Sequence, residues 1–273
     1  MSGAAPLPSR LVLLGHPVSK SLSPVFQNAA LAAAGLPIRY SALDVAPADL
    51  SAVIEQLRQE GAAGNVTVPH KRAVALACHS LTPVAQRAGA VNTFWFEEGR
   101  LMGDNTDVGG FAAAVDELLQ LRATDRWPGR IALLGAGGAA RGVLVAAERR
   151  GVEEVEVLAR NAENARQLQA EFPVVRCADE ALPPDTALVV NATPIGMGSD
   201  DFPLSPAELP PGAAVLDLVY RRGETPWVLA CRAAGHRAMD GLPMLLAQGA
   251  LAFERFTGRP PDLRVMRASL EAR

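Results

Sequence analysis

An α/β fold of two domains is predicted from the sequence, and three observations carry the prediction. Short hydrophobic runs alternate with helical stretches for most of the chain, which is typical of parallel sheets joined by right-handed crossovers. At 273 residues the chain is long for one compact domain and comfortable for two. A second strand–helix alternation begins at Arg130, after a loop over residues 124–129.

In the first half, strands are expected where β-rich residues lie between turn signals, and helices where the apolar spacing has a helical period. The predicted strands cover residues 11–15, 38–45, 65–68, 91–96 and 101–102, the last two as a hairpin. The predicted helices cover residues 23–35, 47–61, a stretch beyond Pro69, and 107–121. The first helix has Ser23 as its expected N-cap, with Pro24 at the first helical position.

The second half repeats the pattern. Strands are predicted at residues 131–134, 155–158, 187–190 and 215–219, and helices at residues 138–150 and 161–171. Residues 242–256 and 261–270 are helical in character and have no strand of their own. These last helices must therefore pack on an existing domain.

Composition excludes several classes of function. The chain is 49% hydrophobic and 20% charged, which supplies a sizeable core and excludes a disordered protein. Its net charge is -3 without a basic block, so neither nucleic acid nor an anionic membrane is expected as a partner. The three cysteines and four histidines lack metal-ligand spacing, and we expect no metal. Sparse cysteines and the absence of a signal core at residues 1–9 predict a cytoplasmic protein.

The basic residues are unusual. Of the 26, only Lys20 and Lys71 are lysines, and the rest are arginines. A lysine in such a sequence either marks a place that needs a titratable amine or has survived compositional drift.

A glycine-rich loop lies between a predicted buried strand and a predicted helix. The loop reads Gly135, Ala136, Gly137, Gly138, Ala139 and Ala140. Glycines let backbone N–H groups approach a pyrophosphate at the positive end of a helix, so this context predicts a dinucleotide site over an ordinary turn. The next strand ends at Arg160, where an NAD site would normally have a carboxylate. Arginine there favours the 2′-phosphate of NADP.

Lys71 and Asp107 are the candidate acid–base groups. Lys71 follows Pro69 at a predicted helix start, and Asp107 stands at another loop-to-helix junction. A lysine can exchange a proton if burial, a cation or a coupled carboxylate tunes it. Each residue alone would be interpreted as a surface cation or an N-cap.

The joint pattern resembles the shikimate dehydrogenase family. Eight segments, in order along nearly the whole chain, match it: 15–17 with 21–24, 65–71, 89–93, 105–107, 135–141, 191–197, 217–220 with 225–227, and 241–248 with 253–254 and 257–258. The resemblance implies a substrate domain of residues 1–108 plus 241–273, a Rossmann NADP-binding domain of residues 109–240, and a cleft between them. It also implies reversible NADPH-dependent reduction of 3-dehydroshikimate to shikimate, by a monomer or homodimer.

The resemblance also assigns roles to residues of this chain. Lys71 and Asp107 would form the catalytic pair, without a formal assignment of the proton to either. The implied substrate-binding residues are Ser21, Ser23, Asn65, Thr67, Asn92, Tyr220 and Gln248. The implied cofactor-binding residues are Gly135, Ala136, Gly137, Gly138, Ala139, Ala159, Arg160, Asn161, Thr193, Leu218, Gly241 and Met244.

Three departures and two alternatives remain. Lys20 and Gln27 stand where the family usually has histidine, and Ala159 and Asn161 replace the usual neighbours of Arg160. A paralogue that oxidises quinate or aminoshikimate, with NAD or NADP, would share every motif. A catalytically silent dinucleotide sensor would share the fold but would not need both Lys71 and Asp107.

Overall fold

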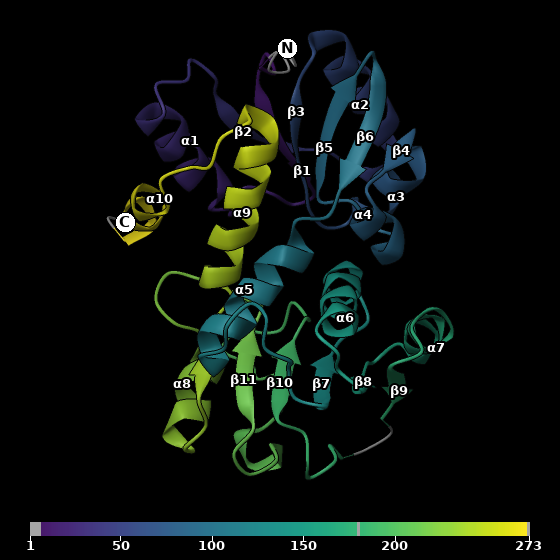
Figure 1. Ribbon diagram of the computed structural model, residues 1–273, viewed down its shortest axis with the longest axis vertical. Helices are drawn as coiled ribbons and strands as arrows, with labels where there is room; N and C mark the ends of the chain where they lie inside the picture. The colour runs from purple at the N-terminus through teal and green to yellow at the C-terminus, as the bar shows by residue number, and fades with distance from the viewer. Residues whose placement is uncertain (1–6, 179–180, 272–273) are drawn as a thin grey trace. The chain divides into compact units, whose positions relative to one another are not determined.

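The computed structural model describes residues 7–178 and 181–271 and contains two units (Figure 1). Unit 1 comprises residues 1–110 and 245–273, and unit 2 comprises residues 111–244. Residues 1–6, part of the segment for which no signal core is expected, lie outside the description. Each unit has its own sheet of six strands, as expected for an α/β chain of two parts.

The sheet of unit 1 is mixed. Its strands are β1 (Leu11–Gly15), β2 (Tyr40–Asp44), β3 (Ala63–Val66), β4 (Ser80–Leu81), β5 (Thr93–Glu97) and β6 (Arg100–Asp104). They lie in the order β2-β1-β3-β5-β6-β4, with β5 antiparallel to both of its neighbours. Because β5 runs the opposite way, its first residue lies beside the carboxyl ends of β3 and β6, where Asn65 pairs with Thr93 and Thr93 with Asp104.

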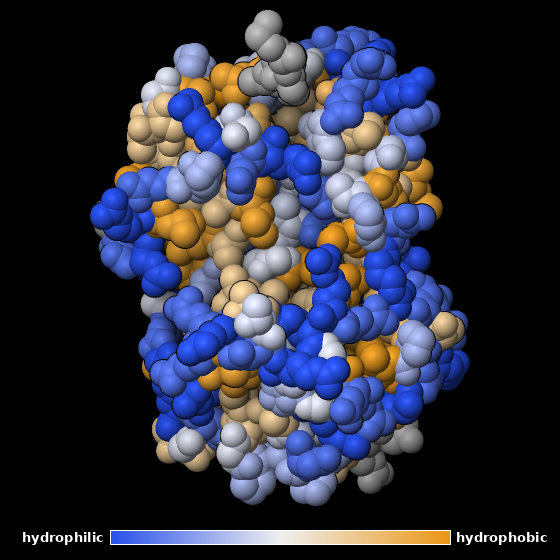
Figure 2. Space-filling model, viewed as in Figure 1, coloured by the Kyte–Doolittle hydropathy of each residue, from blue (hydrophilic) through white to orange (hydrophobic). Residues whose placement is uncertain are grey.

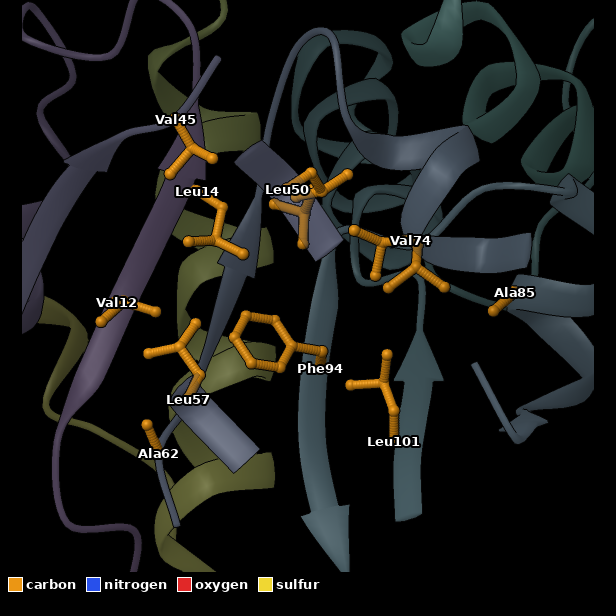
Figure 3. Close-up of a cluster of buried hydrophobic side chains, with 12 residues drawn as sticks. Val12, Leu14, Val45, Leu50, Leu57, Ala62, Val74, Ala85, Phe94 and Leu101 are labelled. Atoms are coloured by element: carbon orange, nitrogen blue, oxygen red, sulfur yellow. The ribbon is translucent and has the colours of Figure 1, made fainter. Parts of the chain in front are cut away.

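Helices cover both faces of this sheet. They are α1 (Ser23–Ala33), a 3₁₀ turn (Pro47–Asp49), α2 (Leu50–Glu60), α3 (Lys71–Ala77), α4 (Pro83–Ala88), the start of α5 (Asp107–Leu119), most of α9 (Leu242–Thr257), and α10 (Leu263–Glu271). Alternate strand residues face α2, α3 and α4, where Leu14 and Phe94 pack with Leu57 and Val74 (Figure 3). On α9, Gly249 lets the helix approach the ring of Phe26 in α1.

The start of α1 corrects one prediction. Ser23 is the first helical residue and not the N-cap, because Leu22 before it already has a right-handed helical backbone at φ -84° and ψ -9°. No side chain caps this helix; instead, the Ser23 N–H donates to Oγ of Ser21 at 3.2 Å. Pro24 occupies the first turn, as expected.

Unit 2 has an all-parallel sheet. Its strands are β7 (Arg130–Leu134), β8 (Glu154–Leu158), β9 (Val175–Cys177), β10 (Leu188–Asn191), β11 (Ala214–Asp217) and β12 (Ala238–Met239). The order β12-β11-β10-β7-β8-β9 is that of a dinucleotide-binding Rossmann sheet. The direction of winding reverses between β7 and β10, and ligands bind beyond the carboxyl ends of strands at such a point.

The helices of unit 2 are the rest of α5, α6 (Gly138–Arg149), α7 (Ala162–Glu171), a 3₁₀ turn (Pro206–Glu208), α8 (Pro226–Ala233) and the first residues of α9. On one face of the sheet, Leu134, Val189 and Val215 pack against Trp227 and Val228 of α8. These long buried strands are the ones that the hydrophobic pattern predicts.

Several predicted boundaries change. The strand expected at residues 65–68 runs instead from Ala63 to Val66. The strand expected at residues 38–45 begins only at Tyr40. In the hairpin, Glu98 and Gly99 both have positive φ, at 51° and 73°, which suits the twist of a two-residue turn.

The described residues contain neither a membrane-spanning helix nor a cluster of metal ligands. No helix among the described residues is long and apolar enough to cross a membrane. On the face in Figure 2, hydrophilic residues are spread over both units, with smaller hydrophobic groups between them. Within the same residues, no cluster of His, Cys, Asp and Glu is arranged to hold a metal ion.

Candidate active site

Lys71 and Asp107 form a largely buried ion pair in unit 1. The Lys71 Nζ donates to Asp107 Oδ2 at 2.6 Å, and the two side chains are only 13% and 9% exposed. Interpreted singly, Lys71 would be a surface cation, and the structure excludes that interpretation. The motif-based prediction of a pair is therefore the one that matches the observed geometry.

The local fold explains how residues 36 positions apart meet. Beyond β3, the chain turns through Pro69, and α3 begins at Lys71. The N–H of Val91 donates to the Lys71 carbonyl at 2.9 Å and fixes the start of that helix. Asp107 is the first residue of α5, directly after the loop that follows β6. Both side chains thus leave helix starts near the carboxyl ends of β3 and β6, the two strands on either side of β5.

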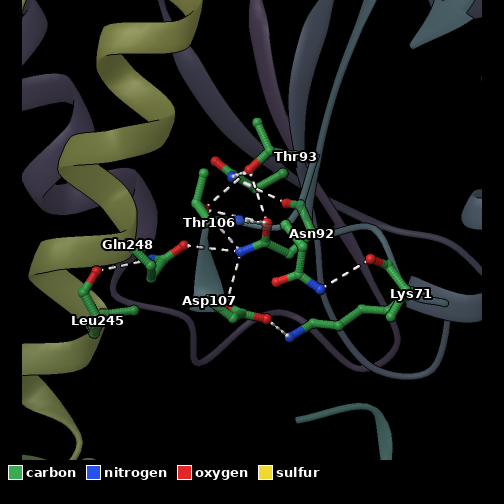
Figure 4. Close-up of polar contacts among 10 residues, drawn as sticks. Lys71, Asn92, Thr93, Thr106, Asp107, Leu245 and Gln248 are labelled. Carbon is green, nitrogen blue, oxygen red and sulfur yellow. Dashed lines mark hydrogen bonds and ion pairs between the residues drawn. The ribbon is translucent and has the colours of Figure 1, made fainter. Parts of the chain in front are cut away.

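Asn92 connects this pair to α9 (Figure 4). Its Nδ2 donates to Asp107 Oδ1 at 2.7 Å and to Thr106 Oγ1 at 3.0 Å, with a longer contact to Gln248 Oε1 at 3.4 Å. Its Oδ1 accepts from the Thr106 N–H at 2.7 Å. Gln248 is held in turn by donating to the Leu245 carbonyl at 2.8 Å. Both oxygens of Asp107 are therefore hydrogen-bonded, one by an amine and one by an amide.

Thr93 extends the network to Asn65, and sequence reasoning assigned Thr93 no role. Its hydroxyl donates to Asn92 Oδ1 and accepts from Asn65 Nδ2, each at 3.0 Å. Asn65 Oδ1 accepts from the hydroxyl of Tyr40 at 2.9 Å. Thr106 was also missed, although both threonines lie within motifs that were recognised. No local sequence signal identifies them, because their places follow from the strand register that sets Thr93 beside Asp104.

Three predicted hydroxyl residues of unit 1 lie outside this network. Among the described residues, Ser21 Oγ accepts only from the Ser23 N–H. The hydroxyls of Ser23 and Thr67 form no hydrogen bond to any described residue, although Ser23 is 7% exposed. These groups are available to a ligand.

In unit 2, the glycine loop has the shape that a dinucleotide site requires. Gly135 has φ 107°, and a Cβ there would lie 3.2 Å from the backbone of Ala192. A Cβ on Gly137 would meet nothing within 4 Å, so the space above it is open. Gly137 is the N-cap of α6, which has no side-chain cap and leaves its first N–H groups available to an anion. The loop also includes Ala136, Gly138 and Ala139.

Arg160 is exposed, and it forms no hydrogen bond or ion pair with any described residue. The two nearby carboxylates of β8 are engaged elsewhere. Glu154 and Glu156 pair with the guanidinium of Arg130 at 2.7 and 3.0 Å. The charge at the strand tip is therefore positive.

The neighbours of Arg160 have different environments. Ala159 is half-buried. Asn161 is the N-cap of α7, and its Oδ1 accepts from the N–H groups of Glu163 and Asn164 at 3.0 and 3.1 Å. Its side-chain oxygen is thus committed to the helix, and its amide nitrogen is the group left for a ligand.

A second polar network lies at the carboxyl ends of β10 and β11. Asn191 Nδ2 donates to Asp217 Oδ1 at 2.8 Å, and Asn191 Oδ1 accepts from the N–H and hydroxyl of Thr193 at 2.9 and 2.7 Å. Asp217 Oδ2 accepts from the Thr225 hydroxyl at 2.8 Å. Burial raises the pKa of Asp217, and its hydrogen bonds act in the opposite direction. Thr193 is therefore rigidly placed.

The remaining predicted residues of unit 2 adjoin this network or follow it. The Gly241 N–H donates to the Val219 carbonyl at 3.0 Å, and a side chain at Gly241 would collide with the carbonyl of Leu218. Tyr220 follows Val219 in the sequence and is half-buried. Met244 lies in the first turn of α9. The predicted residues Tyr220 and Met244 belong to unit 2, while the Lys71 network belongs to unit 1.

Comparison with known proteins decides the family. Residues 13–94 match the family model described as the shikimate dehydrogenase substrate binding domain, and residues 241–271 match that of the shikimate 5'-dehydrogenase C-terminal domain. The chain is 40% identical to the shikimate dehydrogenase (NADP(+)) of Mesorhizobium japonicum, with 94% of each chain covered. The chain belongs to the shikimate dehydrogenase family. The resemblance predicted from its motifs is confirmed.

Solved structures of this family agree with the fold. The shikimate 5-dehydrogenase of Thermus thermophilus, crystallised with NADP(H) and shikimate, is 37% identical and matches with a TM-score of 0.83 over 96% of this chain and 98% of its own. The quinate dehydrogenase of Corynebacterium glutamicum with NAD is 29% identical and matches with a TM-score of 0.86 over 97% and 99%. The predicted α/β class with parallel-rich sheets is confirmed.

Proposed function

We propose that this protein is an NADP-dependent oxidoreductase that reversibly reduces 3-dehydroshikimate to shikimate, a step toward the aromatic amino acids. The observation that carries the proposal is the ion pair of Lys71 and Asp107, joined to Asn92, in a chain that belongs to the shikimate dehydrogenase family. The pairing of a titratable amine with a fixed carboxylate is what reduction of a ketone needs, because the oxygen gains negative charge as it is reduced.

Lys71 would deliver the proton to the oxygen of the ketone. Asp107 holds the amine at 2.6 Å and is itself held by Asn92, so that Nζ has one defined position from which to donate. The two groups are hydrogen-bonded and titrate together, so the proton is assigned to the pair. In the oxidative direction the same pair would accept the proton of the substrate hydroxyl.

The substrate is a small hydroxylated acid, and the polar residues of unit 1 suit it. The hydroxyls of Ser21, Ser23 and Thr67 would bind it directly, since the last two have no other partner among the described residues. Asn65, Asn92 and Gln248 would contact ring hydroxyls through groups that the network orients. The hydroxyl of Tyr220 would donate a further hydrogen bond to the carboxylate of the substrate.

The residues of unit 2 fit NADP. The open space above Gly137, the positive φ of Gly135 and the start of α6 without a side-chain cap suit a pyrophosphate. Arg160, which has no partner among the described residues, suits a 2′-phosphate. The remaining contacts would come from Ala136, Gly138, Ala139, Ala159, Asn161, Thr193, Leu218, Gly241 and Met244. When bound, NADPH supplies the hydride.

The proposal also assigns each part of the chain to one of two domains. Residues 1–108 plus 241–273 would form the substrate domain and residues 109–240 the cofactor domain, apart from residues 1–6, 179–180 and 272–273, which lie outside the description. The grouping of the chain into two units with boundaries inside α5 and α9 supports this division. We place the reaction in the cytoplasm, and a monomer or a homodimer would suffice for it.

One experiment separates this function from its alternatives. Purified protein is offered shikimate or quinate, each with NADP+ or NAD+, and nicotinamide absorbance is followed. Turnover with shikimate and NADP+ is the expected result. Turnover only with quinate and NAD+ would replace the proposal with a quinate dehydrogenase, for which the likeness to the Corynebacterium enzyme is the motivating observation. Binding of NADP+ without turnover of any substrate would indicate a sensor.

A further inference from the structure

Asp217 is a carboxylate buried at the end of β11 with no cationic partner. The residue is 0% exposed, and within residues 7–178 and 181–271 it forms no ion pair. Its oxygens accept from three donors: Asn191 Nδ2 at 2.8 Å, the Val219 N–H at 3.1 Å and the Thr225 hydroxyl at 2.8 Å. These three donors stabilise the ionised form of the carboxyl, while burial raises its pKa.

The contacts of Asp217 lead to the residues expected around the nicotinamide. Through Asn191, it is one side chain away from Thr193. Asp217 also directly precedes Leu218 in the chain. The backbone carbonyl of Asp217 packs closely against Gly241, since it lies 3.2 Å from the position that a Cβ would take there. Asn191, Thr193, Asp217 and Leu218 stand at the carboxyl ends of β10 and β11, and Gly241 follows β12. Of these strands, β10 borders the point where the winding of the sheet reverses.

The neighbourhood of Asp217 is negative overall. The charged group that acts on it is the carboxyl of Asp240, whose pKa burial also raises. The nearby thiol of Cys231 is neutral, because burial and Asp217 raise its pKa to about 11. Glu224 and Arg232 act on Asp240 and pair with each other at 2.5 Å. No charge in this set neutralises Asp217 directly.

We propose that Asp217 is a positioning residue that uses its charge to set the balance between oxidised and reduced cofactor. This inference rests on the proposed function. The nicotinamide ring carries a positive charge in NADP+ and none in NADPH, while the rest of the molecule keeps the same charge. A negative charge on Asp217 would therefore stabilise NADP+ relative to NADPH if the nicotinamide binds against Thr193, Leu218 and Gly241, and burial of the carboxylate reduces the screening of that charge by solvent.

The test uses Asp217→Asn, a substitution of nearly the same shape. The new amide keeps one oxygen for Asn191 and Val219 and turns its NH₂ toward the Thr225 hydroxyl, which can accept as well as donate. Dissociation constants for NADP+ and NADPH are measured by titration calorimetry on the full chain without substrate. We expect NADP+ to weaken relative to NADPH by about three- to tenfold. Asp217→Glu keeps the negative charge, so its ratio of the two dissociation constants should equal that of the wild type.

Thr225→Val is the matched control, since it removes the hydrogen bond to Asp217, together with the N-cap contact to the Val228 N–H, and leaves the carboxylate. It should change both dissociation constants by the same factor. An unchanged ratio in a folded Asp217→Asn variant, or an equal change of the ratio in Thr225→Val, would overturn the proposal. If Asp217→Asn does not fold, Asp240→Asn removes the neighbouring negative charge and should shift the ratio the same way. Failure of the wild-type protein to bind either nucleotide would instead overturn the proposed function.

Discussion

Replacing Lys71 tests whether its amine transfers the proton. Lys71→Arg keeps a cation beside Asp107 but cannot give up its proton at any working pH, whereas Lys71→Met removes the cation. A positioned general acid contributes about 10²- to 10⁴-fold, so we expect both variants to lose that much kcat. The KM for shikimate should change much less, because separate hydroxyl and amide groups bind the substrate.

The structure also gives a magnitude for stability. At the observed 2.6 Å, two unit charges attract by about 6 kcal/mol at an effective dielectric constant of about 20. Desolvation cancels most of this for a pair that is 13% and 9% exposed. Lys71→Met leaves Asp107 buried with only the amide of Asn92, and breaking such a pair costs about 3–5 kcal/mol. The double variant Lys71→Met with Asp107→Asn leaves no buried charge and should recover part of the loss.

Steady-state kinetics and urea unfolding measure the two effects separately. If Lys71→Arg retained kcat within about threefold, Lys71 would not be the proton donor. If KM rose while kcat stayed intact, Lys71 would be a binding residue. A Lys71→Met protein as stable as the wild type would contradict the electrostatic reasoning, and so would a double variant less stable than the single one.

Three further substitutions address other parts of the chain. Arg160→Ala should weaken NADP+ by about 10- to 100-fold and leave NAD+ almost unchanged, since a charge-assisted contact is worth about 1.5–3 kcal/mol; equal losses in titration calorimetry would contradict the 2′-phosphate assignment. Gly110→Ala places a Cβ 2.6 Å from the Cβ of Gln248, so thermal unfolding should show that the free energy of unfolding falls by about 1–3 kcal/mol. An unchanged melting temperature would mean that α9 moves away without cost. Burial raises the pKa of Asp240, so the folded protein holds more protons than the unfolded protein between about pH 3.9 and the raised folded pKa, and stability falls as pH rises through that window. Asp240→Asn keeps an oxygen for the Leu242 N–H and removes this pH dependence. The urea midpoint of the variant should therefore rise relative to that of the wild type between about pH 4 and pH 7, and a difference that stays constant with pH would contradict the raised pKa of Asp240.

The sequence predicts those parts of the fold whose signal is local. The strands β1, β7, β8 and β10 are buried hydrophobic runs between turns, and each was expected within about two residues. The short strands β4, β9 and β12 and the helices α4 and α8 were not expected. Two or three residues are too few for a periodic pattern, and such strands form because a neighbouring strand offers hydrogen bonds.

The start of α1 shows a different limit. A serine before proline is a common N-cap, and the pattern at Ser23 favours one. In the structure, the hydroxyl of Ser21 accepts the Ser23 N–H, and the turn that brings it there makes Leu22 helical in its backbone. The choice between two serines in one short segment depends on the loop as a whole, which local preference does not describe.

The site divides in the same way. Lys71, Asp107 and Asn92 were expected from motifs, and the structure joins them by direct hydrogen bonds. The positions of Thr93 and Thr106 follow only from the antiparallel placement of β5 between β3 and β6. A chain of side-chain hydrogen bonds is a property of strand register, and the sequence pattern of a hairpin does not specify that register to one residue.

The scarcity of lysine acquires a chemical meaning at one of its two positions. Lys71 is buried against Asp107 and belongs to the network around it, while Lys20 is exposed and forms no hydrogen bond or ion pair with the described residues. An arginine at position 71 could hold Asp107 equally well, so the ion pair alone does not require lysine. Proton transfer does require it, because a guanidinium stays protonated. The permanent charge of Arg160 suits a phosphate for the same reason. The composition thus separates two kinds of cation, and at Lys20, where no contact selects the amine, compositional drift is a sufficient explanation.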